Sequence, residues 1–200
     1  MEGMGVTLLL SLITVVFGTI LGTVFALMRL SKSKILNIIS ETYTEIVRGI
    51  PLLLQLWVIY LLFSSALGKV GAVCLALLLN SAAYVAEIIR SGIQAVDKGQ
   101  VEASRSLGIN ANKTMTKIVL PQAVKNILPA LGNEFVTVIK ETSLSSVFYI
   151  GDLMTAKTII TTQTYSAIEP YIIIGIIYFI LTYTLSKFIG KFEKRLKLSD

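Results

Sequence analysis

Long apolar runs without a single charged residue dominate this sequence of 200 residues. Four such runs cover residues 3–28, 49–68, 70–86 and 170–186. A helix needs about 20 mostly apolar residues to cross the hydrocarbon core of a membrane, and these runs approach or exceed that length. Only 15% of the residues are charged, against about 25% in an ordinary soluble domain. The sequence therefore predicts an all-α integral membrane protein, because helices satisfy their own backbone hydrogen bonds in lipid.

A fifth segment, 126–150, is apolar in outline but contains Glu134, Lys140 and Glu141. We count it as a span, which gives about five transmembrane helices in a single domain of residues 1–200. The predicted spans cover about residues 4–29, 50–68, 70–90, 126–150 and 170–189, with a cytoplasmic loop at about 91–125. The first run carries no small-residue cleavage signature, so we interpret it as a retained span.

The distribution of basic residues predicts the orientation of these spans, because short cytoplasmic loops are enriched in lysine and arginine. Fifteen of the 18 basic residues fall on one side of the predicted spans. They are Arg29, Lys32, Lys34 and Arg48, then Arg90, Lys98, Arg105, Lys113, Lys117 and Lys125, then Lys187, Lys191, Lys194, Arg195 and Lys197. The N-terminus is therefore expected outside and the C-terminus in the cytoplasm. Because the basic residues are scattered over three segments, we expect no nucleic-acid partner.

The predicted cytoplasmic loop contains a motif with fixed spacing. Glu102-Ala103-Ser104 is followed after three residues by Gly108, and after nine more by Ile118-Val119-Leu120-Pro121. We expect residues 100–107 to form a short helix that Gly108 ends in a left-handed conformation. Leu120-Pro121 should then break the next segment. The small residues Ala103 and Ser104 should permit close approach by another protein.

This motif resembles the EAA motif of binding-protein-dependent ABC importer permeases, with Ser104 in place of the second alanine. Arg48-Gly49-Ile50-Pro51 and Lys140-Glu141-Thr142-Ser143-Leu144 are similar to the polar amino-acid branch, of the histidine, arginine and glutamine type, although Glu141 replaces the usual aspartate. The resemblance implies that the loop forms a coupling helix in a cleft of an ATPase subunit. The coupling residues it implies are Glu102, Ala103, Ser104, Arg105, Gly108, Leu120 and Pro121.

No phosphate-binding G-x-x-x-x-G-K-[ST] loop occurs in the chain, so the energy for uphill transport must come from another polypeptide. The chain has no histidine and one cysteine, Cys74, which removes zinc sites and histidine-based triads. We therefore expect a non-catalytic subunit without a metal or cofactor, whose partner binds ATP and Mg²⁺.

The resemblance implies further partners in a prokaryotic inner or plasma membrane. They are two ABC ATPase subunits, a second permease copy or a paralogue, and an extracytoplasmic amino-acid-binding protein. The binding protein is expected to meet the outer loop at 151–169, where Asp152, Lys157 and Glu169 are possible contacts or simply solvated side chains.

Polar side chains inside apolar spans are costly, which makes them the default candidates for contacts with substrate. One stripe of segment 126–150, within about 80° of arc, holds Glu134, Thr137, Glu141 and Ser145. A stripe of segment 70–90 holds Asn80, Tyr84, Glu87 and Ser91. We expect the two stripes to line one cavity, with the substrate-binding candidates Asn80, Tyr84, Glu87, Glu134, Thr137 and Glu141.

An amino acid always presents an ammonium group and a carboxylate. We expect Glu134 to bind the ammonium, and Asn80 or backbone N–H groups to meet the carboxylate. Glu87 lies nearer the cytoplasmic end, where Arg90 is expected to pair with it, so Asn80 and Tyr84 are the better candidates. Alternatively, Glu134 and Lys140 belong to structural networks with neighbouring helices.

The sequence thus predicts a permease subunit of an ATP-driven importer for polar or basic amino acids. An ABC permease for another small polar solute, such as an opine, is an alternative. A less favoured alternative is an ATP-independent secondary carrier, which would have no use for the cytoplasmic motif. A structural membrane scaffold would not explain the acidic residues inside the spans.

Overall fold

A computed structural model describes residues 2–166 and 168–197 of the chain, and every element in this part is helical. The elements are α1 (Glu2–Arg29), α2 (Lys34–Gly49), α3 (Leu52–Gln94), α4 (Lys98–Ser106), α5 (Ala111–Thr114), the π-helix η1 (Met115–Val119), α6 (Leu120–Glu141), the 3₁₀ helix η2 (Thr142–Phe148), α7 (Leu153–Thr164) and α8 (Ile168–Lys197). The all-α prediction is confirmed. The predicted domain of residues 1–200 also includes residues 1, 167 and 198–200, which lie outside the described residues.

Three helices in the described part of the chain are long and apolar enough to cross a membrane. They are Glu2–Arg29, Leu52–Gln94 and Ile168–Arg195. Helix α3 has 43 residues, a length of about 65 Å, which is roughly twice the thickness of the hydrocarbon core. Gly68 interrupts α3 with φ 70° and ψ 171°, where the sequence predicts the boundary between the second and third spans. A count of five spans thus depends on dividing α3 at Gly68 and on including α6.

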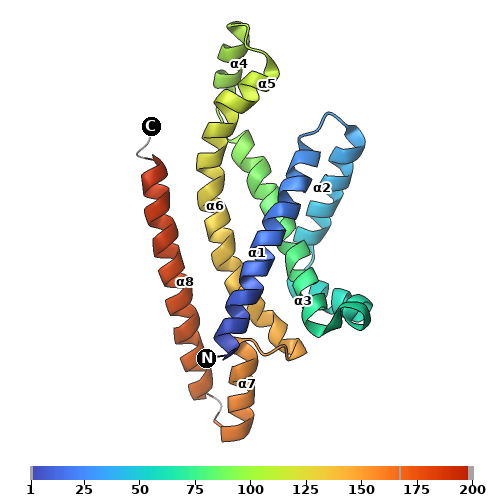
Figure 1. The fold of residues 1–200 in the computed structure, drawn as a ribbon, viewed down its shortest axis with the longest axis vertical. Coiled ribbons are helices and arrows are strands. Elements are labelled where there is room, and N and C mark those ends of the chain that lie inside the picture. The colour runs from blue at the N-terminus through green and yellow to red at the C-terminus, as the bar shows by residue number, and fades with distance from the viewer. Residues whose placement is uncertain (1, 167, 198–200) are drawn as a thin grey trace.

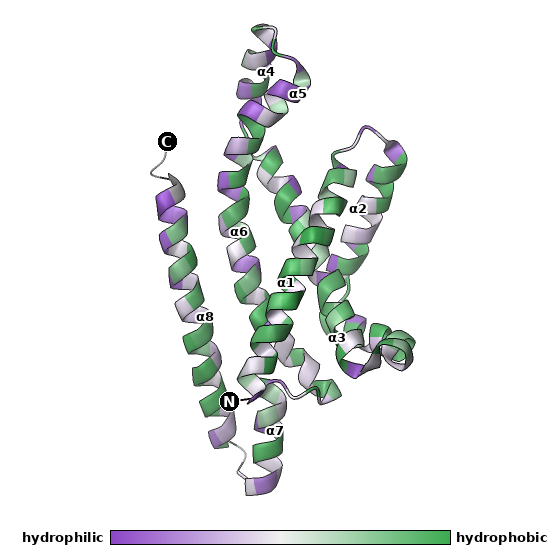
Figure 2. Ribbon diagram, viewed as in Figure 1, coloured by the Kyte–Doolittle hydropathy of each residue, from purple (hydrophilic) through white to green (hydrophobic). Residues whose placement is uncertain are grey.

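The helices form an elongated bundle with a distinct element at each end (Figure 1). The second half of α3 leads to α4 and α5, which protrude at one end, and α6 returns from there. The N-terminus and α7 lie at the opposite end, and α8 runs along the side of the bundle. Hydrophilic residues gather on α4, α5 and the C-terminal end of α8, while α1 and the rest of α8 are mostly hydrophobic (Figure 2).

Helix α2 is an element that the sequence analysis missed, because residues 30–49 contain too many charges for a span. It packs beside α1 after a short turn (Figure 1). Arg29 donates to Glu41 at 2.7 Å, and the Ser40 hydroxyl donates to the carbonyl of Phe25 at 2.7 Å. Arg48, which the sequence analysis counts among the basic residues of one side, lies in the last turn of α2.

Small residues allow α1 and α3 to approach closely. Gly18, Gly22 and Ala26 recur every four residues on α1 and are buried. A Cβ atom at Gly22 would lie 2.7 Å from the side chain of Val85 and from the carbonyl oxygen of Ala82. Helices associate in lipid through such close backbone packing, because no hydrophobic driving force acts between them there.

The predicted break at Leu120-Pro121 was wrong. Pro121 lies in the first turn of α6, and the chain is helical from Ala111 to Phe148. The π-helical turn Met115–Val119 precedes it. Such a turn shifts the hydrogen-bond register by one residue, so the proline ring and its missing N–H are accommodated without ending the helix.

Candidate functional site

Helices α4 and α5 and the turn between them form a compact knob, residues 97–114. Asp97 caps α4 by accepting from the N–H of Gly99 at 2.7 Å, and Asn110 caps α5 by accepting from the N–H of Lys113 at 2.9 Å. Gly108 has φ 77° and ends the turn after α4 in the left-handed conformation that favours glycine. The predicted short helix and its glycine end are therefore present, with the helix at Lys98–Ser106.

The knob presents some predicted coupling residues and buries one. Glu102, Ala103, Arg105 and Gly108 are exposed on its surface. Ser104 is 3% exposed, and its hydroxyl lies 2.9 Å from the hydroxyl of Thr114. The expectation that Ser104 lets a partner approach was wrong, because this side chain joins α4 to α5 inside the knob.

Leu107 is a surface residue of the knob that the sequence analysis missed. Its side chain is 80% exposed between Ser106 and Gly108. An aliphatic side chain can anchor a protein partner by filling a pocket on it, which makes Leu107 a candidate contact. The apolar residue before the motif glycine was the available signal. Leu120 and Pro121 are also exposed, but they lie at the start of α6, outside the knob.

The two predicted polar stripes meet through Ser81. The Ser81 hydroxyl of α3 donates to a carboxylate oxygen of Glu134 on α6 at 3.1 Å. Glu134 is only 9% exposed. Glu134 therefore reaches α3 through a serine next to Asn80 in sequence, and no bond joins it to Asn80.

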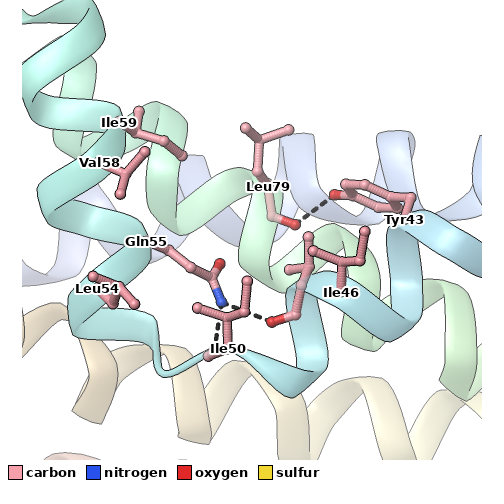
Figure 3. Close-up of a pocket in the computed structure, with 9 residues that line it drawn as sticks. Tyr43, Ile46, Ile50, Leu54, Gln55, Val58, Ile59 and Leu79 are labelled. Carbon is pink, nitrogen blue, oxygen red and sulfur yellow. Dashed lines mark hydrogen bonds between the residues drawn. The ribbon is translucent and has the colours of Figure 1, made fainter.

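Asn80 instead belongs to a chain of hydrogen bonds that starts at the break between α2 and α3. The side-chain amide nitrogen of Gln55 donates to the carbonyls of Val47 and Ile50, each at 2.7 Å (Figure 3). The side-chain oxygen of Gln55 accepts from the amide nitrogen of Asn80 at 3.2 Å. Asn80 is 3% exposed, and its side-chain oxygen has no hydrogen-bond partner among the described residues. Gln55 was missed because a single glutamine in an apolar run gives no pattern.

Gln55 also marks the edge of an apolar groove of about 240 Å³ between α2 and α3 (Figure 3). The groove is lined by Tyr43, Ile46, Val47, Ile50, Leu54, Gln55, Val58, Ile59 and Leu79. The Tyr43 hydroxyl donates to the carbonyl of Leu79 at 2.6 Å, which ties α2 to α3. None of the predicted substrate residues lines this groove.

Tyr84 and Glu87 face arginine side chains. Glu87 accepts from the Arg90 Nε at 2.8 Å, as expected from their spacing, and its carboxylate lies 3.6 Å from the Arg48 guanidinium. The Arg48 guanidinium lies 5.6 Å from the ring centroid of Tyr84. These contacts tie α2 to α3, so the stripe from Asn80 to Ser91 does not face α6 as a unit.

One face of α6 is both polar and uncovered. It carries the exposed residues Gln122, Asn126, Asn133 and Lys140, which share one side of the helix. Thr137 and Glu141 are half-buried and lie between this face and Glu134. We call these six residues, without Glu134, the polar face of α6. Lys140 thus lies beside the predicted acidic stripe on an exposed surface.

The stripe does not continue to Ser145 with α-helical geometry. The α-helix ends at Glu141, and residues Thr142–Phe148 form a 3₁₀ helix. Ser145 is fully buried, and its hydroxyl donates to the carbonyl of Thr142. Its predicted place on the stripe was therefore wrong.

The segment predicted as an outer loop contains α7. Asp152 is buried at the start of this helix, where it accepts from the N–H of Met154 at 3.0 Å. Lys157 is buried too, with its ammonium 4.0 Å from the ring centroid of Tyr171. These two residues stabilise α7, whereas Glu169 remains exposed.

Curated relatives match nearly the whole chain. The chain is 43% identical to the arginine transport system permease protein ArtQ of Bacillus subtilis, a match that covers 100% of this chain and 93% of the relative. It is 41% identical to the putative glutamine transport system permease protein GlnP of Rickettsia bellii, over 99% of this chain and 93% of the relative.

Solved structures of ABC transporters also match nearly the whole chain. A structure described as an amino acid ABC transporter with histidines has a TM-score of 0.92 and 46% identity, and the match covers 96% of this chain and 92% of that one. The MetNI methionine ABC transporter shares the fold, with a TM-score of 0.80 at 18% identity, over 97% of this chain and 94% of that one. The family model of the binding-protein-dependent transport system inner membrane component matches residues 8–198, and this chain belongs to that family.

Proposed function

We propose that this chain is the permease subunit of an ATP-driven importer for polar or basic amino acids. The observation that carries the proposal is the combination, in one bundle of apolar helices, of a protruding knob at one end and an uncovered polar face on α6. The knob suits coupling to an energy source, and the polar face suits passage of a polar solute. The arginine and glutamine relatives and the amino acid transporter structure support amino acids as the substrate class.

The knob is the proposed contact with the ATPase subunit. Leu107 would fill an apolar pocket of the ATPase, with Glu102, Ala103, Arg105 and Gly108 around it. Ser104 acts indirectly, because it holds α4 against α5. The ATPase subunits, two in each complex, would bind and hydrolyse ATP with Mg²⁺, while this chain carries out no chemical reaction.

The polar face of α6 requires a cover. Lys140 lies in the last turn of α6, and the cost of a lysine that faces lipid reaches about 2.5–3.5 kcal/mol at the middle of a span. Asn133 and Asn126 add to this cost on the same side of the helix. A second permease subunit, either a copy or a paralogue, would cover this face and enclose a polar pathway between the two chains. We propose that the pathway runs along α6.

Asn80 and Glu134, both buried in this structure, remain the proposed contacts for the substrate, and half-buried Thr137 and Glu141 would link Glu134 to the pathway along α6. The nitrogen of Gln55 lies between two carbonyls, so its oxygen must face Asn80, which in turn fixes the Asn80 nitrogen as the donor. The free atom of Asn80 is thus an acceptor. Asn80 would therefore bind the ammonium group together with Glu134, and not the carboxylate as the sequence analysis expected.

The proposed orientation places the knob in the cytoplasm and the N-terminus with α7 on the outer side, where the extracytoplasmic binding protein would dock. The end of the bundle with the knob is hydrophilic, as Figure 2 shows. Fifteen basic residues were assigned to that side from the sequence, and Arg48 now lies within a helix that starts there.

The test is transport by the reconstituted complex. The chain would be incorporated into liposomes with its ATPase and binding protein, and uptake of labelled arginine, histidine, glutamine and glutamate measured with and without internal ATP. We expect ATP-dependent uptake of at least one of the four. Uptake of the same size without ATP would support a secondary carrier, and uptake of none would indicate another polar solute.

A further inference from the structure

The C-terminal end of α8 carries a basic hollow that transport of an amino acid does not explain. The hollow has a volume of about 550 Å³ and is lined by Tyr183, Ser186, Lys187, Gly190, Lys191 and Lys194. We propose that it binds the phosphate headgroup of an anionic phospholipid, with the acyl chains lying along α8. This inference does not depend on which solute the protein transports.

Three lysines converge on one side of the helix. Lys187, Lys191 and Lys194 follow the i, i+4, i+7 spacing of a single helix face. All three are exposed. Glu193, the acidic residue of this stretch, lies about 120° away from that face at helical spacing. The face is therefore positively charged, and a phosphate group complements it.

Gly190 lines the hollow, and a Cβ atom added there would meet nothing within 4 Å, so open space lies beside this glycine. On the side of the hollow toward the N-terminus of α8, the ammonium of Lys187 lies 5.3 Å from the ring centroid of Tyr183. Tyrosine rings favour the level of the lipid headgroups, where one end of the ring is apolar and the other is hydrated. This contact places the lysines at the boundary of the membrane.

The same face of α8 continues as an apolar stripe that suits an acyl chain. Ile173, Ile176 and Ile180 lie on this face between Tyr183 and the N-terminal end of α8, and all three are more than half exposed. The rise from Ile176 to Lys187 is about 16 Å, close to half of the roughly 30 Å hydrocarbon core. One lipid molecule in a single leaflet is therefore long enough to extend from the lysines along this stripe.

The position of the hollow favours a lipid over the ATPase as its partner. The knob of α4 and α5 extends beyond the C-terminal end of α8 along the bundle axis (Figure 1). A protein docked on the knob would lie outside the membrane, whereas α8, which carries the hollow at its C-terminal end, is mostly hydrophobic over the rest of its length (Figure 2). Clusters of lysine next to a transmembrane helix are attracted by the negative charge of anionic lipids at the membrane surface.

The experiment is lipid binding to the purified complex. Native mass spectrometry would count phosphatidylglycerol and phosphatidylcholine molecules, of matched acyl chains, that the complex retains. The test variant combines Lys187→Gln, Lys191→Gln and Lys194→Gln, and the control removes the same charge through Lys32→Gln, Lys34→Gln and Lys69→Gln, which are exposed outside the hollow and the knob. We expect the native protein and the control to prefer phosphatidylglycerol over phosphatidylcholine by at least about tenfold, and the test variant to lose this preference. Each lysine near the membrane surface contributes about fivefold to the affinity for an anionic lipid.

A variant with arginine at the three positions keeps the charge and should keep the preference, which separates lost binding from misfolding. Glycerol phosphate, which has the headgroup chemistry without acyl chains, should not displace the lipid at the same concentration. Equal preference in the test variant and the control would overturn the proposal. Displacement by glycerol phosphate would assign the hollow to a soluble phosphate, and loss of the ATPase without loss of lipid would assign it to a protein contact.

Discussion

Glu134 is the residue on which the proposed transport site depends most. It is 9% exposed within α6, and the hydroxyl of Ser81 donates to one of its carboxylate oxygens at 3.1 Å. Burying an ionised carboxylate is costly unless it is paired and hydrogen-bonded, and one serine is a weak partner. A cationic ammonium group from a passing amino acid would supply the missing partner.

Glu134→Gln tests this role with little change in shape. Glutamine keeps an oxygen that accepts from Ser81 but loses the charge that attracts an ammonium group. We expect uptake of the transported amino acid to fall at least about tenfold, equivalent to about 1.4 kcal/mol. Ser81→Ala is the matched control for positioning and should reduce uptake less. Uptake by Glu134→Gln at the native rate would remove Glu134 from the site.

For single residues, the sequence indicates which side chains are candidates for the site better than it predicts which side chains they contact. Asn80 and Glu134 were recognisable because a polar side chain is costly in a span. Their partners Gln55 and Ser81 were not, because pairing across helices depends on the rotation of each helix about its axis. Ser104 shows the same limit, since the motif gives its position in α4 but not the direction of Thr114.

Among the elements, the knob owes its shape to a single glycine. Gly108 has φ 77°, where a residue with a Cβ atom is strained. The backbone N–H of Gly108 donates to the carbonyl of Arg105 at 2.9 Å, and that of Ile109 to Ser104 at 3.0 Å. A change of conformation at Gly108 would therefore move Leu107, the exposed side chain beside it.

Gly108→Val should weaken binding of the ATPase subunit without unfolding the bundle. A β-branched residue in the left-handed region costs about 1–2 kcal/mol, which corresponds to a loss of about five- to thirtyfold in affinity if the strain appears in the docked state. Gly108→Asn is the control, since asparagine tolerates this conformation. Co-purification of the ATPase in detergent measures the effect. Equal retention by both variants would show that the glycine conformation is not required.

The contact between α1 and α3 is a second test at the level of elements. Gly22→Leu would place side-chain atoms where Val85 and the carbonyl of Ala82 already lie, 2.7 Å from the new Cβ. Overpacking of this kind costs about 1–3 kcal/mol, so we expect a lower melting temperature in detergent. Gly5→Leu is the control, because a Cβ at Gly5 meets nothing within 4 Å. Identical melting temperatures for the two variants would contradict the close packing.

The helices that hydropathy can detect were predicted from the sequence, and α4 was predicted from its motif, whereas α2 and α7 were missed. The apolar runs of α1 and α8 stand out because lipid imposes a length and a composition on them. Helix α2 has Glu41, Glu45 and Arg48 among its apolar residues, so no run of sufficient length remains. The change to a 3₁₀ helix after Glu141 is set by tertiary packing of buried Thr142 and Ser145, which periodicity does not show.

For the whole molecule, the uncovered polar face of α6 implies a partner chain in the membrane. Asn126, Asn133 and Lys140 are exposed on one side of a helix that is packed elsewhere by α1, α3 and α8. Lipid does not satisfy these groups, whereas a second permease subunit and a hydrated pathway do. In the proposed complex, the bundle would be one half of the translocation unit.

A cysteine at position 133 locates this partner. After Cys74→Ala removes the native thiol, we expect Asn133→Cys to give a cross-linked permease pair in membranes treated with a short bifunctional thiol reagent. Ile173→Cys, on the lipid-facing side of α8, is the matched control and should give little product. Cross-linking of Ile173→Cys but not of Asn133→Cys would place the subunit interface on α8.

In the proposed complex, the knob passes the energy of ATP hydrolysis to transport along the bundle. Uptake and ATP hydrolysis should be measured in the same proteoliposomes for the native chain and for Leu107→Asp, with Leu107→Met as the control that keeps an apolar anchor. We expect that uptake requires ATP and that Leu107→Asp loses most ATP-driven uptake while Leu107→Met retains it. Full ATP-driven uptake by Leu107→Asp, or uptake that continues without ATP, would contradict it.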